Sequence, residues 1–117
     1  MQEFLRQRSH QPKEPSAGCV FKNPTLTQGQ RLSLITHYPE AENKISQNRL
    51  IPAAWLIDQC GLRGKMVGGA QVSPKHVNFI VNSGRAKAKD VKKLIALIKK
   101  MVYNKFNIKL QEEIEIV

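Results

Sequence analysis

The chain is poor in cysteine, aromatic residues and acidic residues, and each shortage excludes a class of protein. Cys19 and Cys60 are its two cysteines, too few for the disulfide framework of a small secreted domain. Aromatic residues make up only 6%, which argues against a platform that stacks nucleic-acid bases. No run approaches the roughly 20 apolar residues of a membrane-spanning helix, and no apolar leader opens the chain. We therefore expect a cytoplasmic protein that does not span a membrane.

Basic residues, in contrast, are abundant. The 19 Lys and Arg against 9 Asp and Glu give a formal charge of +10. This excess predicts an anionic partner, which could be nucleic acid, a nucleotide diphosphate, an acidic membrane surface or a charged protein. With 117 residues, 41% of them hydrophobic, the chain has room for one domain with a real core but not for two.

The apolar pattern predicts helices mixed with strands. A long amphipathic helix is expected over 88–104 and a shorter one over 52–61, where Pro suits the first turn and Gly the left-handed cap. Strand and turn alternate over 62–70, a buried strand is expected within 77–82, and alternating apolar residues favour a half-buried strand over 108–117. The fold class is therefore a single α+β domain, with a small mixed or antiparallel sheet packed against helices.

Two segments carry little apolar periodicity. Residues 1–14 are polar and basic, which indicates an N-terminal arm before the domain at 15–117. Residues 25–51 are rich in Gln, Thr, Asn and Ser, and we predict a long surface loop there.

The segment 15–24, Pro-Ser-Ala-Gly-Cys-Val-Phe-Lys-Asn-Pro, gathers a flexible backbone, a thiol, a cation and an amide. Free cysteine is usually buried and inert, but Cys19 follows Gly and stands near Lys22. A neighbouring cation favours a thiolate, whereas a thiol that keeps its proton, with an ordinary pKa of about 8.5, suits proton donation. The residues alone leave packing, nucleophile and acid open.

Other candidate motifs are weaker. The glycines within 61–69 lack the spacing of a dinucleotide-binding turn. His10, His37 and His76 have no zinc-like spacing with either cysteine, so no metal site is predicted. The lysines of the long helix are typical of a solvated face, although a stripe that binds DNA or RNA stays open as an alternative: Lys92, Lys93, Lys99 and Lys100.

Three segments in the same order resemble the C-terminal domain of UDP-N-acetylenolpyruvoylglucosamine reductase, the flavoenzyme of peptidoglycan precursor synthesis. Residues 15–24 are similar to that family's proton-donor loop. Residues 54–64 and 68–82 are similar to its central block, and 110–114 resembles its terminal Leu-Glu-Pro-Glu-Val. Together they cover most of the chain.

The resemblance implies hydride transfer from FADH2, itself reduced by NADPH, to the enolpyruvyl group, followed by protonation to UDP-N-acetylmuramate. The family's proton donor is commonly Ser. Here the matching position is Cys19, so the thiol is expected to deliver the proton to carbon. Glu113 matches the carboxylate that stabilises or protonates the developing enolate oxygen.

The resemblance also implies contacts to the UDP diphosphate from Asn23, from Arg63 where the family often has Lys, and from His76, with Lys22 a weaker candidate. Arg and Asn suit this role because a diphosphate needs cations and several donors. Nothing in the chain matches the family's flavin-binding region. FAD and NADPH are thus expected to bind mainly outside it, on an FAD-binding domain or subunit that would be its partner.

Two departures from the family accompany these matches. Residues 25–51 exceed the short connection expected there, which predicts an insertion. Lys87 stands where the family has a capping Thr, with Asp90 three residues on, so the long helix should begin less stably by about 1 kcal/mol. The alternative to this whole interpretation is a non-enzymatic basic module that binds RNA or DNA through the lysine-rich helix.

Overall fold

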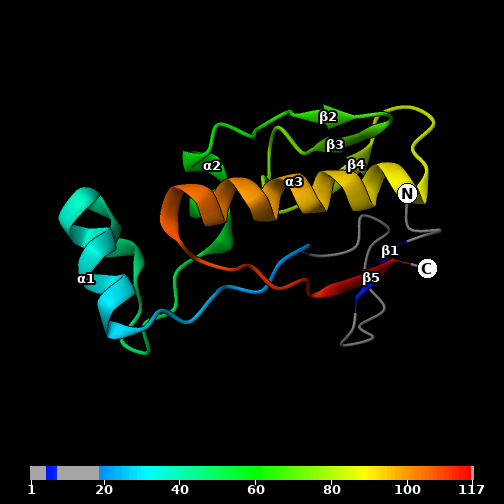
Figure 1. Ribbon diagram of the computed structural model, residues 1–117. Helices are drawn as coiled ribbons and strands as arrows, with labels where there is room; N and C mark the ends of the chain where they lie inside the picture. Colours follow the sequence, from blue (N-terminus) through cyan, green and yellow to red (C-terminus); the bar gives the residue numbers. More distant parts are fainter. Residues whose placement is uncertain (1–4, 8–18, 117) are drawn as a thin grey trace.

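The computed structural model describes residues 5–7 and 19–116, in which helix α3 (Ala88–Phe106) lies along a three-stranded antiparallel sheet (Figure 1). The sheet has the order β2-β3-β4 and consists of β2 (Met66–Val67), β3 (Ala70–Val72) and β4 (Ile80–Asn82). A separate antiparallel pair joins β1 (Leu5–Gln7) to β5 (Ile114–Ile116). The α+β prediction is confirmed. The rest of the predicted N-terminal arm lies outside the described residues.

Helix α3 supplies one wall of the core, as its apolar periodicity predicts. Its buried residues are Val91, Leu94, Ile95, Ile98 and Val102. The helix ends at Phe106. The next residue, Asn107, caps it with a left-handed backbone (φ 58°), and its N–H donates to the Tyr103 carbonyl.

The start of α3 packs against the β2–β3 turn. The Asp90 carboxylate accepts hydrogen bonds from the Lys87 N–H (3.0 Å) and the Gly69 N–H (3.5 Å). Its pKa is lowered chiefly by the bond from Lys87. A Cβ on Gly69 would overlap the Ala86 backbone, so this glycine is required for the close approach. Asp90 supplies one half of a capping box. The other half is missing, because the Lys87 ammonium cannot accept a hydrogen bond from the Asp90 N–H.

Helix α2 (Ala53–Gln59) confirms the shorter predicted helix, and Gly61 follows it with a positive φ of 70°. Its buried face joins the core through Ala53, Leu56 and Ile57. At the other end of the chain, Ile108 and Leu110 are buried as expected, but the regular strand is confined to β5.

The prediction of a loop over 25–51 was wrong for its middle part, which forms α1 (Gln28–His37) and the 3₁₀ helix η2 (Pro39–Lys44). The Gln30 N–H donates to Thr27 Oγ1 (3.0 Å) and the Thr27 N–H to Gln30 Oε1 (2.8 Å). This capping box starts a helix whose only buried residue is Leu34, so apolar periodicity could not reveal it. Figure 1 shows α1 beside the C-terminal end of α3. The predicted insertion relative to the family stays a prediction.

No helix within residues 19–116 is both long and apolar enough to cross a membrane.

Candidate functional site

Cys19 and Glu113, far apart in sequence, are brought together by an antiparallel pairing. Phe21 forms a bridge with Glu112. On either side of it, the Glu113 N–H donates to the Val20 carbonyl (2.7 Å) and the Lys22 N–H to the Gln111 carbonyl (2.9 Å). Because this register sets Val20 against Glu113, the thiol of the preceding residue lies within range of the Glu113 charge, which adds to the increase that desolvation causes in the pKa of Cys19.

Beside Cys19 an open groove of about 530 Å³ runs between the α2 region and the β3–β4 loop. We call it the Cys19 groove. Four of the residues predicted from the sequence line it, namely Cys19, Asn23, Arg63 and His76. These four residues come from two of the three matching segments, and Glu113, from the third, is not among the lining residues. Lys22 is exposed and is not among the lining residues.

The groove is cationic, but only some of its basic side chains form ion pairs with described residues. The Arg63 guanidinium forms an ion pair with Asp58 (Nη2 to Oδ2, 3.2 Å) and also donates to the Pro74 carbonyl. Lys44 and Lys75 line the same groove and make no ion pair with any described residue. Sequence reasoning missed both lysines. Lys75 adjoins His76, which could have drawn attention to it, whereas Lys44 lies on η2, in the segment predicted to be a loop.

Asn23 and His76 are each anchored by a hydrogen bond. Asn23 Oδ1 accepts from the Ala53 N–H (2.9 Å) at the start of α2, where Pro52 offers no side-chain cap. This orientation leaves the Asn23 amide nitrogen as a donor. The His76 N–H donates to Ser73 Oγ (3.1 Å), and the His76 ring lies 5.5 Å from that of Phe79.

The Cys19 thiol keeps its proton more tightly than an ordinary cysteine. Cys19 is an exposed residue on the groove surface, but partial desolvation of its thiol and then the Glu113 charge raise its pKa, while the Asn78 side chain and the Cys19 backbone N–H partly offset the increase. At neutral pH the group is therefore a thiol. Of the alternatives that the residues left open, this geometry favours an acid over a thiolate nucleophile.

Residues 10–117 match the family model described as UDP-N-acetylenolpyruvoylglucosamine reductase, C-terminal domain. The chain belongs to this family. Two proteins named UDP-N-acetylenolpyruvoylglucosamine reductase are similar to this chain. One, from Synechococcus sp. (strain JA-3-3Ab), is 41% identical over 98% of the chain. The other, from Leptospira interrogans, is 45% identical over 94%. The chain spans only 30% of the length of each.

A solved structure agrees with this assignment. The UDP-N-acetylenolpyruvylglucosamine reductase from Thermus caldophilus superimposes with a TM-score of 0.54 at 37% identity, covering 91% of this chain and 29% of that one. Membership of the reductase family thus rests on sequence and fold together.

The glycine-rich segment of this reductase domain does not fit a dinucleotide such as FAD. Gly68 and Gly69 form the turn between β2 and β3, and the Asp90 carboxylate already occupies the start of α3 next to them. A pyrophosphate would need that helix end free of negative charge. Among the described residues, no group of three His, Cys, Asp or Glu gathers as a metal site would require.

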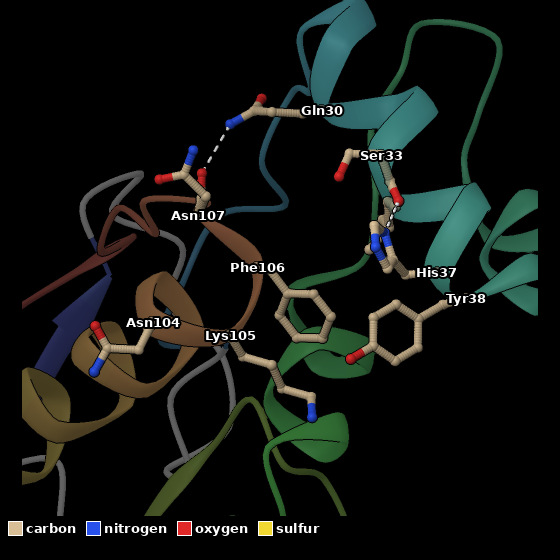
Figure 2. A pocket seen from close by; sticks show the side chains of 9 residues that line it. Gln30, Ser33, His37, Tyr38, Asn104, Lys105, Phe106 and Asn107 are labelled. Atoms are coloured by element: carbon tan, nitrogen blue, oxygen red, sulfur yellow. Dashed lines mark hydrogen bonds between the residues drawn. The ribbon is translucent and has the colours of Figure 1, made fainter.

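A second hollow, of about 270 Å³, lies between α1 and the C-terminal end of α3 (Figure 2). We call it the helix joint. Gln30 Nε2 donates across it to the Asn107 carbonyl (3.1 Å), and His37 Nδ1 donates to the Ser33 carbonyl (2.8 Å). The rings of Tyr38 and Phe106 meet at 5.4 Å. Gln30 and His37 thus bond to the protein itself, as in a packing contact.

Proposed function

We propose that this chain is the substrate-binding and proton-delivering part of a cytoplasmic, flavin-dependent reductase that converts UDP-N-acetylenolpyruvoylglucosamine to UDP-N-acetylmuramate for peptidoglycan precursor synthesis. The single observation that carries the proposal is the placement of Cys19 on a cationic groove, in the segment whose backbone pairs with that of Glu113. The names of the relatives supply the substrate and the reaction.

The groove provides what a UDP diphosphate needs. Lys44 and Lys75 bring charges that are free of ion pairs with described residues, and Asn23 brings an amide donor. Arg63, fixed by Asp58, presents its guanidinium in one orientation, which suits recognition of phosphate oxygens more than bulk attraction. His76 is placed on the same wall for a further polar contact.

Cys19 then acts as general acid. Once hydride has been added to the enolpyruvyl group, the S–H bond breaks and its proton joins the substrate carbon, using the electron pair of the enol double bond. The sulfur keeps the S–H pair and regains a proton from water. Glu113 acts at the enolate oxygen, as donor or as stabilising partner, which requires a carboxyl group close to the thiol.

The hydride source implied by the resemblance is FAD reduced by NADPH. The glycine-rich turn at Gly68 and Gly69 does not fit that cofactor, because Asp90 occupies the adjoining helix end, and the two relatives are much longer than this chain. We infer that the flavin and NADPH are held by another domain or subunit of the same enzyme, and that the part described here is inactive alone.

The test is a chimera in which this chain replaces the segment that it matches in the Synechococcus relative. We expect the purified, flavin-loaded chimera to form UDP-N-acetylmuramate from NADPH and UDP-N-acetylenolpyruvoylglucosamine. A folded, flavin-loaded chimera that forms none would contradict the proposal. If the chain alone bound duplex DNA or RNA in low salt while the chimera ignored UDP compounds, the nucleic-acid module would replace it.

A further inference from the structure

Asn78, in the loop before β4, is one of two buried polar residues among those described, with 6% of its surface exposed. Neither the sequence pattern nor the family resemblance pointed to it. It lines the Cys19 groove, and all the hydrogen bonds that its side chain makes with described residues go to one residue of the Cys19 segment. This buried amide therefore holds the backbone of the Cys19 segment in place.

The Asn78 side chain acts as a strand partner for Phe21. Its Oδ1 accepts from the Phe21 N–H (3.0 Å), and its Nδ2 donates to the Phe21 carbonyl (3.0 Å). The Asn78 backbone carbonyl also accepts from the Val20 N–H (2.7 Å). One residue thereby satisfies three backbone groups immediately after Cys19.

The opposite edge of the same segment pairs with 111–113, including the bond from the Glu113 N–H to the Val20 carbonyl (2.7 Å). The Cys19 segment is therefore held on two sides, by Asn78 and by the Glu113 segment. Without the Asn78 side, Cys19 would be located by a single line of contacts, and its direction toward the groove would be free to vary.

We propose that Asn78 is a positioning residue for the proton donor: it fixes the Cys19 segment, and its Nδ2, which gives one hydrogen to the Phe21 carbonyl, has a second hydrogen available to the sulfur that is left when the proton departs. This inference rests on the proposed function for its place in catalysis, but its geometry does not. After proton transfer the sulfur carries a negative charge beside Glu113. An amide donor at that point stabilises the charge, since hydrogen bonds to an ionised acceptor are the strong ones.

The electrostatics of Cys19 agree with this role. Asn78 lowers the pKa of the thiol, against the increases from burial and from Glu113. The other charged or titratable groups of the groove are Lys44, Asp58, Arg63, Lys75 and His76, and none of them is among the causes of the shift. Asn78 is thus the side chain that favours the thiolate.

The test measures iodoacetamide alkylation of Cys19 in the full chain as a function of pH, with peptide mass spectrometry to separate Cys19 from Cys60. Asn78→Asp retains an acceptor for the Phe21 N–H but loses the donor and adds a charge, and Asn78→Ala loses the whole side chain. We expect both to shift the Cys19 profile to higher pH, slowing alkylation at pH 8 by about fivefold for Asn78→Ala and by more for Asn78→Asp.

The matched control is Asn82→Ala, because the Asn82 side chain also makes two hydrogen bonds to backbone groups: its Oδ1 accepts from the N–H groups of Gly84 (3.0 Å) and Ala86 (3.2 Å). It should leave the Cys19 profile unchanged. A Cys19 profile that is unmoved in Asn78→Asp, or moved equally by Asn82→Ala, would overturn the inference. If Asn78→Ala does not fold, the comparison of Asn78→Asp with Asn82→Ala still tests the inference. The alkylation needs no flavin or substrate, so failure of the proposed function would appear separately, in the turnover of the chimera.

Discussion

The Cys19 groove and the helix joint differ in where their polar side chains find hydrogen-bond partners. In the helix joint, Gln30 and His37 donate to carbonyls of the joint itself. In the groove, Lys44 and Lys75 line the open space and make no ion pair with any described residue, whereas the Lys105 ammonium of the helix joint lies over the Tyr38 ring at 5.8 Å. Both hollows contain lysine, aromatic and amide groups. What distinguishes a binding surface is that donors and charges are left for a partner.

Among the substitutions that keep Cys19, the one at Glu113 should have the greatest effect. We expect Glu113→Gln to lower turnover of the chimera about 100-fold, because the enolate oxygen loses its acid or stabilising partner. Glu112→Gln is the matched control. The Glu112 carboxylate forms an ion pair with Lys99 (3.0 Å), so this substitution should change turnover little. Equal losses in the two variants, from steady-state rates, would show that strand pairing and not the carboxylate is responsible.

The lysines give the next effect. Lys44→Ala and Lys75→Ala should each raise the KM for the UDP substrate about fivefold, because each removes from the groove a cation that makes no ion pair with a described residue. Lys105→Ala is the control in the helix joint, where the ammonium already lies over Tyr38 at 5.8 Å. Substrate titrations at low and high salt would check this, and a KM that rises equally in Lys105→Ala would break the distinction between the two hollows.

Gln30 tests the helix joint in the opposite way. Gln30→Ala should lower the free energy of unfolding by about 1 kcal/mol, since it removes the capping bond to Thr27 and the bond to Asn107. KM should not change. Gln28 lies two residues earlier on the same helix, and its side chain makes no hydrogen bond to described residues. Gln28→Ala should therefore lower the free energy of unfolding less. Denaturant titrations measure the difference; a stability loss as large in Gln28→Ala would refute the role of the bonds.

The two thiols offer the smallest effect and contrast the regions directly. Burial raises the pKa of both Cys19 and Cys60, but the Glu113 charge adds to the increase at Cys19 whereas the Lys105 charge opposes it at Cys60. We expect Glu113→Gln to speed alkylation of Cys19 alone, and Lys105→Met to slow that of Cys60 alone, each by a few fold. Rates measured between pH 7 and 10 would decide, and a shift at the wrong thiol would contradict the assignment.

The same shifts set a pH dependence of stability. Both thiols have folded-state pKa values above that of an ordinary cysteine. The folded state therefore holds protons that the unfolded chain releases, and stability should fall as pH rises above about 9. Thermal unfolding of the unmodified chain and of Cys19→Ser would show whether the decline becomes shallower when one thiol is removed.

The predictable parts of the molecule are those with a strong local pattern. The apolar stripe of α3 and the glycine after α2 determined those helices from sequence alone. Helix α1 was missed because its evidence is the reciprocal bond between Thr27 and Gln30, and it buries only Leu34. Asn78 was missed for another reason: its partner Phe21 is 57 positions away, so no local pattern could reveal it. Lys44 was missed together with the helical segment that carries it.

The most direct test of the central claim is the rate of product formation by the chimera with Cys19→Ala and Cys19→Ser, after its flavin has been reduced and substrate added. If the thiol delivers the proton, Cys19→Ala should be slower by about 10²- to 10⁴-fold, whereas Cys19→Ser, which keeps an O–H donor, should retain most of the rate. Product formation by Cys19→Ala at the unmodified rate would contradict it.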